Sequence, residues 1–171
     1  MKRNDILNQA NLSSLDAATH DRPVAGRSMQ SEPPRGPLRI LIVDDSAITR
    51  AVIRRSIKIA TTASPRPVTM AEACDGAEGL DKLRAEPFDV CFLDLNMPRM
   101  GGLEMARAVF ADGTLSTAIV IVSSESMSKK IAQLKQEGVR GYIRKPFAPE
   151  QIRDMLQLLA DGGELPNRIA A

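Results

Sequence analysis

The residues with the clearest chemical potential are three aspartates that directly follow apolar runs. Asp94 follows the run Val-Cys-Phe-Leu, and Asp44 and Asp45 follow the run Ile-Leu-Ile-Val. A carboxylate at the end of a buried strand loses its hydration unless a counter-charge compensates it. Lys145 is a candidate for that counter-charge, and Ser123 is a candidate hydroxyl donor beside it. We therefore interpret Asp94 as a nucleophile that accepts a phosphoryl group, beside acids that hold a metal ion.

Three carboxylates at one place repel one another, so either their pKa values rise or a cation lies between them. Oxygen ligands with room for water favour Mg²⁺. Asp45 and Asp94 are the expected direct ligands, together with the backbone carbonyl of Asn96, and Asp44 acts through a water molecule. In-line phosphoryl transfer also needs positive charge on the moving oxygens, which Lys145 would supply. A simpler alternative for the first acid pair is helix capping after a strand.

Parallel strands alternating with helices would position these residues. Five short aliphatic segments indicate strands, and each precedes a segment with helical periodicity. The strands are predicted at residues 39–43, 68–73, 88–93, 118–122 and 141–143. The helices are predicted around the apolar positions of residues 48–59, 77–83, 103–110, 126–137 and 149–159. This order predicts an α/β fold, a doubly wound five-stranded parallel sheet with five helices.

The candidate residues all fall at the carboxyl ends of predicted strands. Ligands of doubly wound sheets bind beyond this edge, where the strand order switches direction. Four unrelated surface residues would rarely share one edge. In the helix after Asp45, the side chains of Ile48, Val52 and Ile59 recur at helical spacing and are predicted to form its apolar stripe.

Composition limits the remaining possibilities. The chain has 171 residues with a net charge of +2 and no tryptophan, which gives no argument for a nucleic-acid partner. It has no apolar run long enough to insert into a membrane, so we expect a cytoplasmic protein. The cysteines, Cys74 and Cys91, are interpreted as reduced core thiols. Residues 1–37 are Pro-rich and polar and are predicted to be a disordered leader, or else a short amphipathic docking segment. A tail follows from residue 162.

The ordered set of motifs resembles the receiver domain of two-component response regulators. The matching features are Asp44 and Asp45 after a strand, Asp94 in DLNMPRMGG, Ser123 ending IVIVS, and Lys145 in GYIRKPF. The resemblance covers residues 38–161. It implies a flavodoxin-like fold with strand order 2-1-3-4-5, bound Mg²⁺, and phosphotransfer to Asp94 from a histidine kinase or histidine phosphotransfer protein.

The resemblance also implies roles for individual residues. Ser123 and Tyr142 resemble the family's switch residues, and Lys145 resembles its invariant lysine, whose bond to Pro146 is often cis. Asn96 and Glu125 take the positions that flank the attacking water and set the lifetime of the acyl phosphate. Phosphorylation is then expected to change the surface made by the helix 126–137, the strand 141–143 and the helix from residue 149, which binds a target protein.

Three functions follow as hypotheses. The first is a stand-alone response regulator in chemotaxis or a related phosphorelay, a monomer or weak dimer, with no enzymatic activity beyond slow self-dephosphorylation. The alternative is a pseudo-receiver that binds proteins without phosphorylation. A hydrolase that uses Asp94 as its nucleophile is disfavoured, because a phosphohydrolase of the Asp-x-Asp type would have a second acid where Asn96 stands.

Overall fold

The computed structural model describes residues 36–124 and 128–160, without the side chains of residues 128–132. Residues 1–35 of the predicted leader, the predicted tail and Glu125 therefore lie outside the described residues. Within the described ranges, no helix is both long and apolar enough to cross a bilayer.

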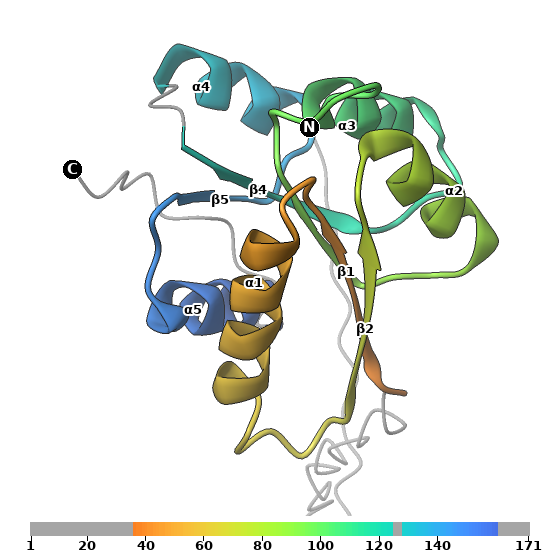
Figure 1. The fold of residues 1–171 in the computed structure, drawn as a ribbon. Helices are drawn as coiled ribbons and strands as arrows, with labels where there is room; N and C mark the ends of the chain where they lie inside the picture. Colours follow the sequence, from red (N-terminus) through yellow and green to blue (C-terminus); the bar gives the residue numbers. More distant parts are fainter. Residues whose placement is uncertain (1–35, 125–127, 161–171) are drawn as a thin grey trace, which may run out of the picture. The chain divides into compact units, whose positions relative to one another are not determined.

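A parallel sheet carries the fold, with strands and helices in strict alternation (Figure 1). The strands are β1 (Leu38–Val43), β2 (Val68–Ala73), β3 (Val90–Leu93), β4 (Ala118–Ser123) and β5 (Gly141–Arg144). The helices are α1 (Ala47–Ala60), α2 (Gly76–Ala85), α3 (Gly102–Ala111), α4 (Ser128–Glu137) and α5 (Pro149–Ala160). Every strand pair is parallel and the order is β2-β1-β3-β4-β5, which confirms the predicted flavodoxin-like fold.

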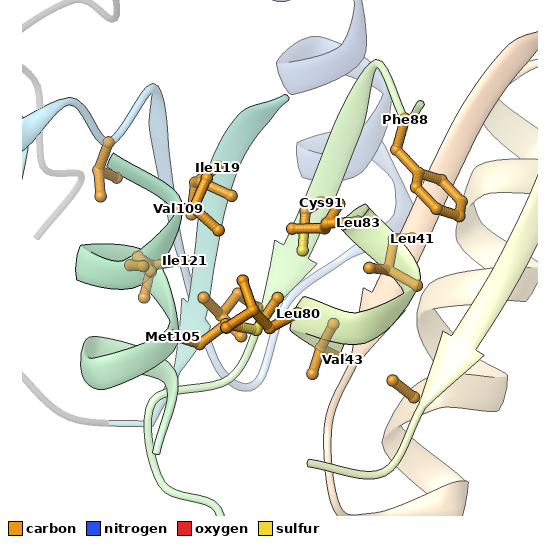
Figure 2. Packing of buried hydrophobic residues seen from close by; sticks show 14 of the residues in the cluster. Leu41, Val43, Leu80, Leu83, Phe88, Cys91, Met105, Val109, Ile119 and Ile121 are labelled. Carbon is orange, nitrogen blue, oxygen red and sulfur yellow. The ribbon is translucent and has the colours of Figure 1, made fainter. Parts of the chain in front are cut away.

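The sheet is covered on both faces, as its near-continuous aliphatic strands predict. Helices α1 and α5 pack against one face and contact each other, with Ile53, Ile57 and Ile152 in their core. Helices α2, α3 and α4 cover the opposite face (Figure 1). Figure 2 shows Leu80 of α2 and Met105 of α3 among the side chains of the strands on that face. The central strands are therefore held rigidly between two apolar layers.

The predicted apolar stripe of α1 is wrong. Ile48, Val52 and Ile59 are 79%, 46% and 54% exposed, whereas the helix buries Ile53 and Ile57 against the sheet. Two apolar stripes run along this helix at compatible spacings, and the sequence pattern alone does not decide which one faces the sheet. The outcome is a row of exposed aliphatic side chains on the outer surface of α1.

The two cysteines differ in their surroundings. Cys91 in β3 is fully buried, as predicted for a core thiol, and burial raises the pKa of its thiol. Cys74 is exposed, so its prediction as a core thiol is wrong. Strand β2 ends at Ala73, and Cys74 lies in the turn that leads to α2.

The registers of the strands bring the candidate residues to one edge. Val43 of β1 pairs with Leu93 of β3, so the next residues, Asp44 and Asp94, emerge side by side. Ser123, the last residue of β4, pairs with Arg144 of β5, and Arg144 directly precedes Lys145. The expectation that these residues share the carboxyl edge of the sheet is met.

Candidate functional site: an acidic pocket at the carboxyl edge of the sheet

Backbone hydrogen bonds fix the positions of Asp44 and Asp94 at the strand ends. The amide of Asp44 donates to the carbonyl of Ala73 at 3.2 Å, and the amide of Asp94 donates to the carbonyl of Val43 at 2.9 Å. These bonds continue the sheet one residue beyond the strands. Both carboxylates therefore leave rigid strand ends and not the flexible part of a loop.

The three predicted acids do converge. One carboxylate oxygen each from Asp44, Asp45 and Asp94 lies within 4.8 Å of the others. Asp44 and Asp94 are buried, with 0% and 6% exposure, whereas Asp45 is exposed at the rim. The Ser46 amide donates to Asp44 Oδ1 at 2.8 Å, which orients that carboxylate. The alternative of simple helix capping is not what these two acids do, because Ser46 is the N-cap of α1.

Lys145 bridges the two buried carboxylates. Its Nζ lies 2.7 Å from Asp44 Oδ2 and 3.1 Å from Asp94 Oδ1. Burial lowers the pKa of the Lys145 ammonium group, but its bonds to Asp44 and Asp94 outweigh burial, so its pKa lies above the ordinary value. Lys145 is therefore a fixed positive charge between two acids.

One lysine does not balance three ionised carboxylates. Burial raises the pKa of Asp94, and the nearby charge of Asp44 raises it further, against the opposing effect of Lys145. The pocket therefore keeps an excess of negative charge, lined by hard oxygen atoms. A small divalent cation with oxygen preference, such as Mg²⁺, fits this donor set. Asp44, Asp45, Asp94 and the backbone carbonyl of Asn96 are the groups that would hold it.

The hydroxyl and aromatic candidates lie next to the pocket on β4 and β5. Ser123 is the last residue of β4 and is fully buried, and its carbonyl accepts from the Lys145 amide at 2.9 Å. The Tyr142 hydroxyl also donates to that carbonyl, at 3.4 Å. The peptide bond between Lys145 and Pro146 is cis, as the family resemblance implied. The Ser123 carbonyl is therefore hydrogen-bonded to both Lys145 and Tyr142.

The loop after Asp94 turns back sharply onto the strand end. The Gly102 amide donates to the carbonyl of Leu95 at 3.1 Å. A Cβ atom at Gly102 would lie 1.9 Å from the Asp94 carbonyl oxygen, so no larger residue fits without moving that backbone. The glycine pair in the sequence predicts this loop. Gly102 is the member of the pair whose close approach to the backbone of Asp94 requires glycine.

Sequence reasoning missed two arginines that hold the surroundings of the pocket. Arg50 of α1 donates to the carbonyl of Asp44 at 2.6 Å and pairs with Glu72 of β2 at 2.9 Å. Arg99, in the loop after Asp94, forms an ion pair with the buried carboxylate of Asp75. Arg50 lies in the first turn of α1, a position from which its side chain can reach back to the strand end. No local sequence pattern links Arg99 to Asp75.

Comparison with known proteins agrees with the fold. A family model of the response regulator receiver domain matches residues 40–157, and the chain belongs to this family. Members generally use Mg²⁺ at an acidic pocket and interact with kinases and downstream targets, and they are signalling proteins, not ordinary enzymes.

Individual relatives are similar over the same region. The chain is 34% identical over 124 residues to the chemotaxis protein CheY of Pseudomonas aeruginosa, covering 70% of this chain and 94% of that protein. It is 32% identical to the nitrate/nitrite response regulator protein NarP of Escherichia coli, of which it spans 60%. The structure of the Vibrio cholerae chemotaxis protein CheY4 matches with a TM-score of 0.60 and 31% identity, over 72% of this chain and 99% of that one.

Proposed function

We propose that this chain is a phosphorylation-dependent receiver in which Asp94 accepts a phosphoryl group from a phosphohistidine of a histidine kinase or histidine phosphotransfer protein. The observation that carries this proposal is the position of Lys145, held between the buried carboxylates of Asp44 and Asp94. An ion pair needed only for stability would require one acid, whereas this pocket has three.

The geometry suits an in-line transfer. An Asp94 carboxylate oxygen attacks phosphorus, the bond to the histidine nitrogen breaks with its electron pair returning to the ring, and an acyl phosphate results. Mg²⁺, when bound, would neutralise charge on the transferred oxygens. The Lys145 ammonium group stabilises another of these oxygens, and the Ser123 hydroxyl donates to a third. Burial of Asp94 strengthens each of these interactions, because water screens them less.

Phosphorylation would be sensed through β4 and β5. The added charge draws the Ser123 hydroxyl toward Asp94, and Tyr142, whose hydroxyl already bonds to the Ser123 carbonyl, changes position with it. The surface formed by α4, β5 and α5 then changes its affinity for a target protein. A population shift of this kind needs differential binding of about a few kcal/mol.

The lifetime of the acyl phosphate is proposed to depend on Asn96 and Glu125. Asn96 lies two residues beyond Asp94 and is exposed. Glu125 lies two residues beyond Ser123, outside the described residues. Slow self-dephosphorylation would then proceed through a water between these side chains.

The phosphodonor is proposed to contact the exposed aliphatic row on α1. Ile48 and Val52 lie in the first two turns of α1, which follows Asp45 at the rim of the pocket. A protein that brings a histidine to Asp94 must pass this rim, and burying the row would contribute about 25 cal/mol per Å². A Val52→Ser variant should therefore slow transfer from a protein donor while leaving phosphorylation by acetyl phosphate unchanged.

The biological context is proposed from the relatives. The name of the Pseudomonas relative favours chemotaxis, and a related phosphorelay is the other candidate. We expect a monomeric or weakly dimeric protein in the cytoplasm. The alternative function remains a pseudo-receiver that binds a partner without accepting phosphate.

Intact mass spectrometry after incubation with acetyl phosphate and Mg²⁺ tests the proposal. The wild-type chain should gain the mass of one phosphoryl group, and Asp94→Asn should gain none. Asp89→Asn is the matched control, because Asp89 lies at the other end of the same strand and is exposed. No gain of mass in the wild-type chain would support the pseudo-receiver instead.

A further inference from the structure

The loop between Asp94 and α3 is attached to the start of α2 by an ion pair. The Arg99 guanidinium group contacts the carboxylate of Asp75, whose side chain is only 2% exposed. The same carboxylate caps α2, because Asp75 Oδ1 accepts from the Glu78 amide at 2.9 Å. The Cys74 sulfur lies 3.8 Å from the other oxygen of Asp75 and 3.7 Å from the Arg99 guanidinium. Asp75 thus has a fixed orientation from which it holds Arg99.

A backbone contact lies directly beside this ion pair. The Gly76 amide donates to the Met100 carbonyl at 3.1 Å. A Cβ atom at Gly76 would lie 2.7 Å from that carbonyl oxygen, so glycine is required for the close approach. Two neighbouring loop residues, Arg99 and Met100, therefore contact two neighbouring residues of the α2 start.

Arg99 has a backbone conformation that is uncommon for a residue other than glycine. Its φ is +66°, and among the described residues no other non-glycine residue has a positive φ. This left-handed conformation costs an ordinary L-residue about 1 kcal/mol. The ion pair to a buried carboxylate offsets that cost, because an unpaired Asp75 would leave a buried charge uncompensated.

We infer that Arg99 is a positioning residue for the metal site. Its pairing with Asp75 holds the loop between Asp94 and α3, which carries Asn96, whose backbone carbonyl is the expected fourth ligand. A carbonyl ligand on an untethered loop would have to be ordered when the cation binds, and that entropy cost would weaken binding. The inference rests on the proposed function, because it concerns the affinity of the acidic pocket for Mg²⁺.

Titration calorimetry with Mg²⁺ on the Arg99→Asn variant tests this inference. Asparagine tolerates the left-handed conformation, so the variant removes the ion pair without straining the backbone. We expect its dissociation constant for Mg²⁺ to rise about tenfold, as for other groups that orient metal ligands. Arg99→Lys should recover part of the loss. Arg84→Asn, which removes the exposed ion pair to Asp112, should bind Mg²⁺ as the wild-type chain does.

Further measurements separate positioning from a general loss of stability. Asp75→Asn should weaken Mg²⁺ binding about as much as Arg99→Asn, and the double variant should be no weaker than either single variant, because both remove the same pair. Amide exchange of residues 95–101 without Mg²⁺ should be faster in Arg99→Asn, whereas exchange in the core strands should not change.

The outcomes distinguish this inference from the proposed function. If the wild-type chain does not bind Mg²⁺, the proposed function fails. If the wild-type chain binds Mg²⁺ and Arg99→Asn binds it equally well, or exchanges its loop amides no faster, the positioning role is overturned and the proposed function stands.

Discussion

The two edges of the sheet use the same charged residue types in opposite ways. At the amino edge each acid has its own arginine, in the pairs Arg39–Glu86, Arg66–Asp89 and Arg84–Asp112. At the carboxyl edge Asp44, Asp45 and Asp94 converge, and Lys145 pairs with two of them. Each of these pairs at the amino edge is electrically balanced, whereas the pocket at the carboxyl edge holds three acids and one lysine.

Burial differs in the same direction. The side chains of the Arg66–Asp89 pair are 29% and 41% exposed, so water screens them, and such pairs contribute at most about 1 kcal/mol. The side chains of Asp44 and Asp94 are 1% and 7% exposed, where an uncompensated charge is costly. The ion pairs at the amino edge therefore lie at the surface and contribute little to stability. The pocket at the carboxyl edge holds an excess of negative charge that a bound cation can relieve.

The largest expected effect comes from the close backbone approach at the carboxyl edge. In Gly102→Ala the new methyl group would overlap the Asp94 carbonyl oxygen, so the loop must move, and we expect a loss of more than about 3 kcal/mol in the free energy of unfolding. Gly113→Ala at the amino edge meets nothing within 4 Å and should change stability little. Urea unfolding gives the free energy of unfolding of both variants. Equal losses would mean that the backbone is packed no more closely at Gly102 than at Gly113.

The next effect concerns the shared lysine. Lys145→Met leaves two buried carboxylates without a counter-charge, and we expect it to cost about 2–3 kcal/mol at neutral pH. Arg66→Met at the amino edge, which removes an exposed pair, should cost less than about 1 kcal/mol. Thermal or urea unfolding without Mg²⁺ gives both values. A loss for Lys145→Met no larger than for Arg66→Met would mean that the two edges do not differ.

Neutralising one acid at each edge should change stability with opposite signs. Without Mg²⁺, Asp45→Asn relieves repulsion in the pocket and should raise the free energy of unfolding by about 0.5 kcal/mol. Asp89→Asn loses its ion pair with Arg66 and should lower it by a similar amount. Unfolding curves at low salt resolve the sign. A loss of stability in both variants would contradict a charge excess in the pocket.

The pKa of one carboxyl group at each edge should be shifted, in opposite directions at the two edges. Burial raises the pKa of Asp94, so its carboxyl group holds a proton to higher pH when folded, and its ionisation lowers stability as the pH rises through that range. The Thr114 hydroxyl lowers the pKa of Asp112, which contributes stability that is lost as the pH falls. Carboxyl-carbon NMR titration measures both values. The affinity for Mg²⁺ should fall as Asp94 takes up its proton.

Much of the fold was predictable because its signals are local. The aliphatic runs predict the strands, and the order of strands and helices limits the topology to a parallel sheet. Asp44, Asp94, Ser123 and Lys145 could be placed at one edge for the same reason. Strand ends were less accurate: β3 starts at Val90 and not at Phe88, and Ser123 belongs to β4.

The features that were missed depend on contacts between distant segments. The buried face of α1 depends on its packing against α5, so the periodicity of Ile48, Val52 and Ile59 selected the wrong side. The pairing of Arg99 with Asp75 joins two loops that only the sheet order brings together. Neither contact has a signature in the neighbouring sequence.

A crystal structure of the chain grown with Mg²⁺ and beryllofluoride, which mimics a phosphoryl group, tests directly whether Asp94 accepts a phosphoryl group. We expect the beryllium of beryllofluoride to be bonded to a carboxylate oxygen of Asp94, Mg²⁺ to be bound beside it by Asp45, and Lys145 to contact a fluorine atom. A pocket that holds neither ion, with Lys145 still bridging Asp44 and Asp94, would contradict the assignment of Asp94 as a phosphoryl acceptor.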